Sequence, residues 1–333
     1  MDTPSCADYV ALISTMFARF LQHLDAQVHR GRPFVYQHQA LIVFFTIMQQ
    51  RHIVQFKTQH RWLLQHATER QLIGLTNVPN RTTLSRRFKA LYPVIQDFVA
   101  FLGRDTAELD QAFTHQHLYA DKSLFKAHGP VWHQADRQAG RIPDKLRHLD
   151  TDATWSKSGY HGWVYGYGLH LVCTSSGFPV LVQVETGTVA ESTVLDAQAP
   201  AILETLRPTS LSADNSYTQA RRIRAWARQQ VILLTPALKW QKGRYAIAYH
   251  QFIRQPENAA QLKRRRSAIE PVFDLVAKIL GTTARQKQLP IQKLANVRTC
   301  LALAVLTLQV AMIANSIWGL PIRNISTLAA ACT

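Results

Sequence analysis

The segment at residues 163–184 limits the fold most, because its side chains alternate along two extended stretches. Between 163 and 173, one set of residues (Trp, Tyr, Tyr, Leu, Leu) alternates with a second set (Val, Gly, Gly, His, Val). The turn Ser175-Ser176-Gly177 then leads into the apolar stretch 178–184. Strict alternation on both sides of a glycine turn predicts a β-hairpin.

Helices and strands are expected to alternate after the hairpin. A first strand is expected at 113–119, before Asp121, and the later pattern predicts helix 192–206, strand 210–213, helix 218–229 and strand 231–235. Strands that first meet in a hairpin and then alternate with helices predict a mixed α/β sheet.

The rest of the chain is predicted to be mainly helical. A chain of 333 residues accommodates two or three domains. We expect an all-α N-terminal region at 1–110, an α/β domain at 111–290 with a loop-rich insertion at 236–260 and a helix at 259–280, and a C-terminal helical segment at 291–333. Gln309, Asn315 and Ser316 interrupt the apolar stretch 301–320, which predicts a buried core helix rather than a membrane span.

Positive charge is concentrated in one part of the chain. The net charge is +17, and residues 201–333 contribute 19 basic against 5 acidic side chains, compared with 12 and 8 in 1–110 and 7 and 8 in 111–200. Such a concentration favours a face that binds a polyanion, most simply nucleic acid, over a generally basic surface. The four cysteines are far apart in sequence, which favours neither a zinc ribbon nor a disulfide framework and predicts a reducing, cytoplasmic setting.

A basic helix is expected near the end of the N-terminal region. Asn77-Val78-Pro79-Asn80 breaks a preceding helix, and apolar residues then recur at 84, 88 and 91, at helical spacing. This spacing places Arg86, Arg87 and Lys89 mostly on the outer surface. The pattern is that of a helix-turn-helix whose second helix enters a DNA groove, although ordinary helical domains share it.

Three acidic residues are candidates for metal-dependent chemistry. Asp214 and Asp121 each follow a predicted strand, where α/β folds place functional groups. Glu270 follows the basic run 263–266 on a predicted helix. Taken singly, the aspartates could be helix caps, and Glu270 could pair with Arg266. Taken together, carboxylates in a basic setting would suit Mg²⁺ ions that catalyse displacement at phosphorus, with arginine and lysine holding the DNA backbone.

These residues give the chain its resemblance to a known family. The matching segments are Tyr119-Ala120-Asp121, Gly159 with 165–170, Gly177-Phe178-Pro179, Ala213-Asp214-Asn215-Ser216-Tyr217, and 266–273. In this order, over about 110–320, they resemble the DDE transposases of bacterial insertion sequences, which have a ribonuclease H-like fold.

The resemblance implies a catalytic triad of Asp121, Asp214 and Glu270 that binds two Mg²⁺ ions, with Mn²⁺ able to substitute. It implies that the protein cuts element ends, which carry terminal inverted repeats, by activating water. The 3′ hydroxyl then attacks target DNA. It matches Arg266 to the family's phosphate-contacting arginine. The DNA-binding candidates are Lys263, Arg264, Arg265, Arg266, Lys278, Arg86, Arg87 and Lys89.

The sequence also departs from the family pattern. Lys263 stands where a tyrosine is expected, Leu169 where a lysine often precedes the histidine, and Lys278 lies eight residues after Glu270 instead of seven. The resemblance implies a homodimer that brings two ends together, acting at the nucleoid in the cytoplasm. A non-catalytic DNA-binding protein and a nuclease that cuts without joining are the alternatives.

Other chemistries lack their motifs. The 14 histidines show no zinc-ligand spacing on a helix, and no G-x-S-x-G elbow, P-loop or G-x-G-x-x-G motif occurs. Trp132, Trp155 and Trp163 could stack on a displaced base, but large aromatic residues belong more often to a core, and we expect that here.

Overall fold

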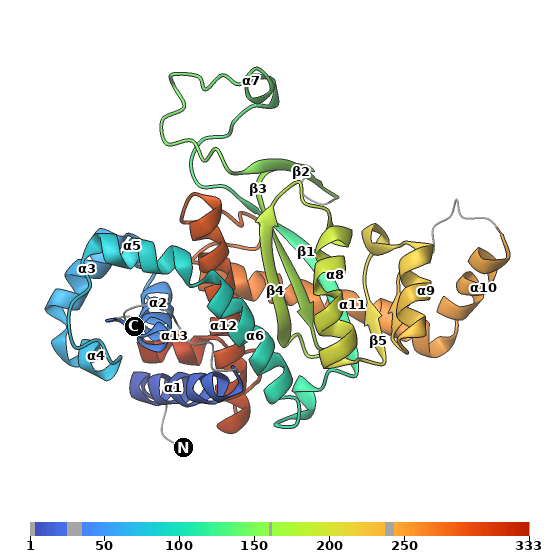
Figure 1. Ribbon diagram of the computed structural model, residues 1–333, viewed down its shortest axis with the longest axis horizontal. Coiled ribbons are helices and arrows are strands. Elements are labelled where there is room, and N and C mark those ends of the chain that lie inside the picture. Colours follow the sequence, from blue (N-terminus) through green and yellow to red (C-terminus); the bar gives the residue numbers. More distant parts are fainter. Residues whose placement is uncertain (1–3, 25–34, 160–161, 237–242, 333) are drawn as a thin grey trace.

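The computed structural model describes residues 4–24, 35–159, 162–236 and 243–332. A six-stranded mixed sheet lies at its centre (Figure 1). The strands are β1 (His117–Lys126), β2 (Thr154–Ser158), β3 (Gly162–Cys173), β4 (Pro179–Thr186), β5 (Ser210–Ser212) and β6 (Ile232–Leu234). Strands β4, β3 and β1 are antiparallel neighbours, and β1, β5 and β6 run parallel. The expected ribonuclease H-like mixed sheet and the β3–β4 hairpin are therefore confirmed.

Strand β1 is longer than the sequence pattern indicated, and it begins at His117 rather than at 113, because residues 111–113 form a short helix. It was expected to end before Asp121, but it continues to Lys126, so Asp121 lies in its middle. The reason is β3, which pairs with β1 from Tyr119 to Lys126. Gly166 permits this pairing at its far end, since a Cβ atom there would overlap the carbonyl oxygen of Phe125.

Helices cover the sheet on its different sides. Helix α11 (Pro256–Ile279) packs on β1, β3, β5 and β6, while α6 (Tyr92–Asp105) and α12 (Leu294–Ile317) pack on β4. Figure 1 shows α11 passing behind the strands, with α8 (Glu191–Pro200) in front. The expected helix at 259–280 is thus confirmed as α11.

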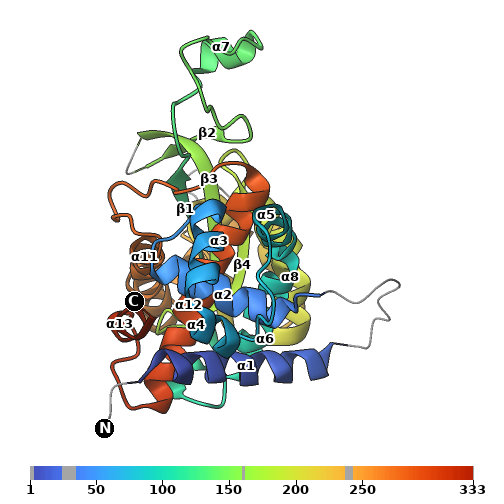
Figure 2. The same ribbon diagram turned by 90° about the vertical axis from the view of Figure 1, so that its left-hand side faces the viewer.

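The N-terminal region is helical, as expected, and it surrounds α12 (Figure 2). Its helices are α1 (Cys6–His23), α2 (His38–Gln50), α3 (Phe56–Gln65), α4 (Ala67–Leu72), α5 (Arg81–Ala90) and α6. Helices α1, α2, α5 and α6 all contact α12. Among the described helices α12 alone is long and apolar enough to cross a membrane, but 89% of its apolar window is buried, which is typical of a core helix.

The remaining helices lie before, between and after the strands. They are η1 (Gln111–Phe113), α7 (Gln134–Gln138), η2 (Ala201–Leu206), η3 (Asn215–Tyr217), α9 (Ala220–Arg228), α10 (Arg244–Ile253) and α13 (Ser326–Cys332). Helices α8 with η2, and α9, confirm the expected helices at 192–206 and 218–229.

The expectation of a loop-rich insertion at 236–260 is wrong for its second half, where α10 forms and α11 begins; residues 237–242 lie outside the described residues. Helix α10 is held in place by Tyr249. Its hydroxyl oxygen accepts a hydrogen bond from the Thr235 N–H at 2.9 Å, beside the end of β6.

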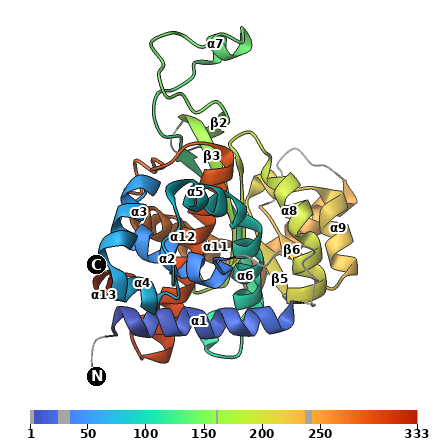
Figure 3. The ribbon, with the colours of Figure 1, turned by 60° about the vertical axis from the view of Figure 1, so that its left-hand side comes forward.

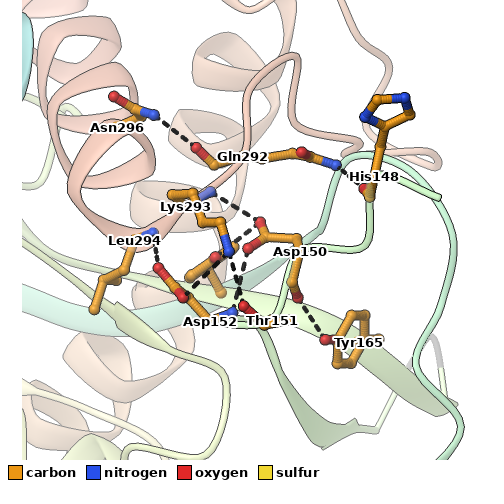
Figure 4. Close-up of polar contacts among 10 residues, drawn as sticks. His148, Asp150, Thr151, Asp152, Tyr165, Gln292, Lys293, Leu294 and Asn296 are labelled. Atoms are coloured by element: carbon orange, nitrogen blue, oxygen red, sulfur yellow. Dashed lines mark hydrogen bonds and ion pairs between the residues drawn. The ribbon is translucent and has the colours of Figure 1, made fainter. Parts of the chain in front are cut away.

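The segment between β1 and β2 projects from the body and carries α7 (Figure 3). Its base is fastened to the N-terminus of α12 (Figure 4). The Asp150 carboxylate accepts from the Lys293 N–H at 3.1 Å and from the Tyr167 hydroxyl at 2.8 Å, and Asp152 accepts from the Leu294 N–H at 3.0 Å. Carboxylates satisfy the free N–H groups at a helix N-terminus and interact well with its dipole. The projecting segment is therefore anchored to the core helix.

Candidate active site

The three acids expected from the sequence line one cleft. Asp121 comes from the middle of β1, Asp214 directly follows β5, and Glu270 lies on α11. The cleft has a volume of about 720 Å³. Asp214 caps the short helix η3, because its carboxylate accepts from the Ser216 N–H at 2.9 Å. Asp214 is therefore both a helix cap, as one interpretation of the sequence expected, and a residue of the cleft. The parallel pairing of β1 with β5 brings Asp121 and Asp214 near each other.

Asp121 is paired with an arginine that the sequence did not single out for this role. Nη1 of Arg265 lies 2.6 Å from Oδ2 of Asp121, with side chains only 14% and 15% exposed. The Lys122 N–H donates to the other oxygen at 2.8 Å. Burial raises the pKa of Asp121 to about 6, although Arg265 and the Lys122 N–H oppose the rise. The negative charge of Asp214 adds to it.

A fourth carboxylate, Glu191, lines the same cleft and was missed in the sequence. The Ser216 hydroxyl contacts the carboxylates of both Glu191 and Asp214. Burial raises the pKa of Glu191 to about 8, and the charge of Asp214 contributes to the rise. Glu191 begins a helix directly after the hairpin, but it belongs to the acid-rich segment 111–200, where one more acid did not stand out.

Lys122 holds the turn that leads to Glu191. Its ammonium group donates to the carbonyl oxygens of Gly187 and Val189 at 2.8 and 2.9 Å. The lysine stem passes over Gly168 of β3, where a Cβ atom would lie 2.7 Å from Cε of Lys122. A glycine at 168 therefore lets Lys122 cross the sheet, and this crossing fixes the start of α8 beside the cleft.

The basic run on α11 divides between the inside and the outside of the molecule. Arg265 faces Asp121, whereas Lys263, Arg264 and Arg266 are exposed. Nε of Arg266 lies 3.7 Å from Oε1 of Glu270, with the arginine side chain 78% exposed. Glu270 therefore pairs with Arg266 at the rim of the cleft, as one interpretation of the sequence expected. Phosphate contact by Arg266 stays a prediction.

The expected lysine Lys278 does not line the cleft. It is an exposed residue in the last turn of α11, where no described contact directs it towards the acids. The cations that do line the cleft are Lys122, Lys157, Arg285 and Lys287. Sequence reasoning missed them, because all four lie outside the basic run 263–266 and come together only through the fold.

The expected DNA-binding helix α5 borders a second hollow, which we call the α3–α5 groove. Its volume is about 930 Å³, and its lining residues are Gln55, Phe56, Lys57, Arg81, Thr82, Ser85, Arg86, Lys89 and Ala90. Arg86 and Lys89 are exposed there, as expected. The placement of Arg87 on the outer surface is wrong. It is buried and donates to the Tyr36 carbonyl oxygen at 3.2 Å. Arg87 comes three residues after Leu84, which places it on the apolar face of the helix.

The three tryptophans do not share one environment. Trp132 and Trp155 pack against the core, and the Trp155 indole N–H donates to the Trp132 carbonyl oxygen at 2.8 Å. Trp163, at the start of β3, is 62% exposed, so the expectation of a core residue is wrong for it. It pairs with Lys157 of β2, in the part of β3 that lies beyond its pairing with β1 and β4, where the sheet leaves it uncovered.

A comparison with protein families agrees with this site. A family model described as transposase DDE domain matches residues 112–304, a range that contains Asp121, Asp214 and Glu270. No curated protein matches the chain. Among solved structures, a Mos1 transposase paired-end complex with the left transposon end is 11% identical, covering 80% of this chain and 86% of that one. A pre-cleavage Mos1 transpososome is 12% identical, covering 89% and 85%. Both have a TM-score of 0.21, which is too low for a conclusion about this chain. The family match spans more than half of the sequence, and the chain therefore belongs to the transposase DDE domain family.

Proposed function

We propose that this protein is a DNA transposase that cuts the ends of an insertion sequence and joins the 3′ hydroxyl to target DNA. The observation that carries the proposal is the convergence of Asp121, Asp214 and Glu270 on one cleft, from three separate elements of the domain that matches the family. In-line displacement at phosphorus requires charge stabilisation on the attacking and the leaving oxygen, and a cleft of carboxylates that bind divalent cations can provide it.

The donor set fits a hard divalent cation. The triad and Glu191 offer only carboxylate oxygens, with the Ser216 hydroxyl between two of them, and Mg²⁺ prefers such ligands, with Mn²⁺ as a substitute. Asp121 already accepts a cation, because the Arg265 guanidinium lies against it. Across the described residues, no group of three acid, histidine or cysteine side chains lies close enough to hold an ion. We therefore propose that the carboxylates close around the metal when it binds.

Asp121, Asp214 and Glu270 would hold two Mg²⁺ ions, which would supply an activated water or hydroxyl nucleophile and stabilise the charge on the phosphate oxygens. The protein residues have roles of their own. Ser216 keeps Asp214 and Glu191 together through its hydroxyl contacts. Arg265 neutralises Asp121 in the metal-free protein, and it must release that carboxylate when a cation takes its place.

DNA would be held outside the cleft as well. The α3–α5 groove offers exposed cations from two helices, which suits terminal-repeat DNA. The exposed Lys263, Arg264 and Arg266 on α11 would contact phosphates near the cleft. The family resemblance implies that two copies of the chain bring two ends together, so we propose a homodimer that acts on DNA at the nucleoid, in the cytoplasm.

Cleavage of DNA by the full-length protein tests the proposal. A duplex with the sequence that flanks the coding region should be cut in Mg²⁺, and the cut 3′ end should be joined to a second duplex. Asp214→Asn should abolish both reactions, whereas Glu204→Gln, an exposed acid away from the cleft, should retain them.

The products distinguish the alternatives. Cutting without joined product would identify a nuclease of this fold. Binding without cutting in either protein would identify a non-catalytic DNA-binding protein. Equal cleavage by the wild type and Asp214→Asn would contradict the triad.

A further inference from the structure

The segment that follows α11 returns to β1 and carries Lys287 into the cleft. The Lys126 N–H donates to the Lys287 carbonyl oxygen at 2.8 Å, and the Leu289 N–H donates to the Lys126 carbonyl oxygen at 2.9 Å. Gln288 forms a parallel bridge with Lys126. These bonds fix the backbone on both sides of Lys287 at the end of the strand that carries Asp121.

Lys287 is a largely buried cation, and its ion pair with Asp274 is long. Its side chain is 13% exposed, and its ammonium group donates to the Ser123 hydroxyl at 3.0 Å and lies 3.7 Å from Oδ1 of Asp274, whose side chain is about half exposed. The ammonium also lies over the rings of Phe125 and Phe273, at 5.9 and 5.6 Å. Lysine is rarely buried without close charge pairing, since removing an ammonium group from water is costly. The Lys287 ammonium group beside the cleft is thus held there despite the free-energy cost of removing it from water.

The backbone of Lys287 is also in an unfavourable conformation. Its φ angle is +41°, in the left-handed region that favours glycine. Such conformations persist where the surrounding structure fixes them, and they are concentrated at functional sites. Here the hydrogen bonds to β1 impose the conformation, and its result is a lysine directed into the cleft rather than into solvent.

The charges around Lys287 belong to the proposed catalytic site. Burial lowers the pKa of Lys287, and the negative charges of Asp274, Asp121 and Glu270 oppose this. Two of the three triad acids therefore act on this ammonium group. Lys278, by contrast, is exposed and does not line the cleft.

We propose that Lys287 contacts the scissile phosphodiester, donating an N–H bond to a non-bridging oxygen as the DNA backbone enters the acid-lined cleft. This inference rests on the proposed function. Phosphate would give the ammonium group the close anionic partner that it lacks, and the lysine would offset the repulsion between phosphate and the carboxylates. Charge-assisted bonds of this kind are short and strong in a partly buried site.

The first test compares Lys287→Met with Lys278→Met in the full-length protein. Methionine keeps most of the stem over the two rings and removes the charge. Binding of the flanking-sequence duplex is measured against salt concentration in Ca²⁺. Lys287→Met should make the log–log salt slope shallower by about 1, as expected for one lost phosphate contact, while Lys278→Met leaves it unchanged. Single-turnover cleavage in Mg²⁺ should fall by about 10- to 100-fold for Lys287→Met only.

Two further variants test the proposal in case Lys287→Met folds poorly. Asp274→Asn removes the carboxylate that competes with phosphate for the ammonium group, so it should tighten DNA binding several-fold. Lys287→Arg keeps the charge and should keep the wild-type salt slope. In EDTA, a lysine with a structural role alone would give Asp274→Asn no larger gain in DNA affinity than Asp214→Asn, which removes another charge of the cleft, and this result would overturn the proposal.

The outcomes separate the two proposals. If the wild type cuts no DNA, the proposed function fails, but a shallower slope in Lys287→Met would still support the phosphate contact. An unchanged slope and an unchanged cleavage rate in Lys287→Met would overturn the contact while leaving the triad intact. A loss in Lys278→Met instead would assign the contact to Lys278.

Discussion

The α3–α5 groove and the acid-lined cleft both have positively charged residues, but only the cleft mixes them with acids. The groove is lined by Lys57, Arg81, Arg86 and Lys89, with no acidic residue among its lining side chains. The cleft is lined by five acids, Asp121, Glu191, Asp214, Glu270 and Asp274, beside four basic residues. A phosphate backbone is attracted to the groove without any cofactor, whereas in the cleft the acids offset the attraction of the basic residues unless a divalent cation neutralises them.

This difference suits the groove to binding DNA and the cleft to catalysis on it. Cations at the surface provide affinity that decreases with salt and tolerates variation in geometry. Catalysis instead needs charge concentrated at one phosphate, and carboxylates can gather divalent cations there at the cost of weaker binding in their absence. We therefore expect changes in the groove to affect affinity and changes in the cleft to affect metal response.

The largest effect is expected from removing charge in the groove. The triple variant Lys57→Ala, Arg81→Ala, Arg86→Ala should weaken DNA binding by roughly 10- to 100-fold at low salt and make the salt slope shallower by about 3. Fluorescence anisotropy over a salt series measures both quantities. Arg104→Ala, an exposed arginine in the last turn of α6 outside the groove, is the matched control. Wild-type affinity in the triple variant would show that DNA does not bind in the groove.

The next prediction compares the stability of two variants of neighbouring arginines on α11, Arg265 and Arg266. Arg265→Met should destabilise the metal-free protein by about 3 kcal/mol, because it leaves Asp121 buried without its partner. Arg266→Met should cost less than about 0.5 kcal/mol, since the Arg266 pair is exposed and long. Urea unfolding in EDTA measures the difference.

Mg²⁺ should restore part of the stability of Arg265→Met, because a divalent cation can replace the guanidinium at Asp121. A loss that Mg²⁺ does not reduce would show that Asp121 is a structural acid only.

The sequence predicted the architecture of the cleft better than its charges. Alternation and helical periodicity located the hairpin, α8, α9 and α11, and the placement of Asp214 after a short strand was correct. These features are local, so one chain segment contains the information. The strand β1 was underestimated because its length depends on pairing with β3, which the first segment alone does not indicate.

The errors at individual residues come from tertiary contacts. Arg87 belongs to a basic helix, yet it satisfies a carbonyl of the preceding chain segment inside the fold. Trp163 is a large aromatic residue left exposed by the sheet edge. Glu191, Arg285 and Lys287 reach the cleft from α8 and the segment after α11, and no spacing rule connects those positions with Asp121. A helical run of four basic residues likewise does not indicate which one faces inwards.

A smaller effect is expected when one carboxylate of the cleft loses its charge. In EDTA, Asp214→Asn should bind DNA a few-fold more tightly than the wild type, because removing one negative charge lowers the repulsion of phosphate. On addition of Ca²⁺ the wild type should gain affinity and the variant should not. The groove variants should keep the Ca²⁺-dependent gain. Weaker binding by Asp214→Asn in EDTA would mean that Asp214 contacts DNA by hydrogen bonding rather than through a cation.

The last effect is absent at neutral pH and concerns acid conditions, to which the two surfaces should respond differently. The groove is lined by lysine and arginine, with no histidine among its lining residues. The sheet beneath the cleft contains His170, which is buried and has no hydrogen-bond partner for either ring nitrogen among the described residues. Burial, with the neighbouring charge of Lys122, lowers the pKa of His170 to about 3.

The unfolded chain therefore binds a proton below pH 6.5 that the folded protein does not take up until about pH 3. The stabilising effect of a neutral His170 is complete above pH 6.5 and is lost as the pH falls towards 3, with a slope of at most about 1.4 kcal/mol per pH unit. His170→Leu should remove this part of the pH dependence, so that the variant and wild-type unfolding free energies diverge in favour of the variant below pH 6.5. Urea unfolding between pH 7 and pH 4 measures the divergence, and the groove triple variant should follow the wild-type profile. Parallel profiles for His170→Leu and the wild type would mean that His170 takes up its proton in the folded state, and the contrast in pH response between the groove and the cleft would then lose its physical basis.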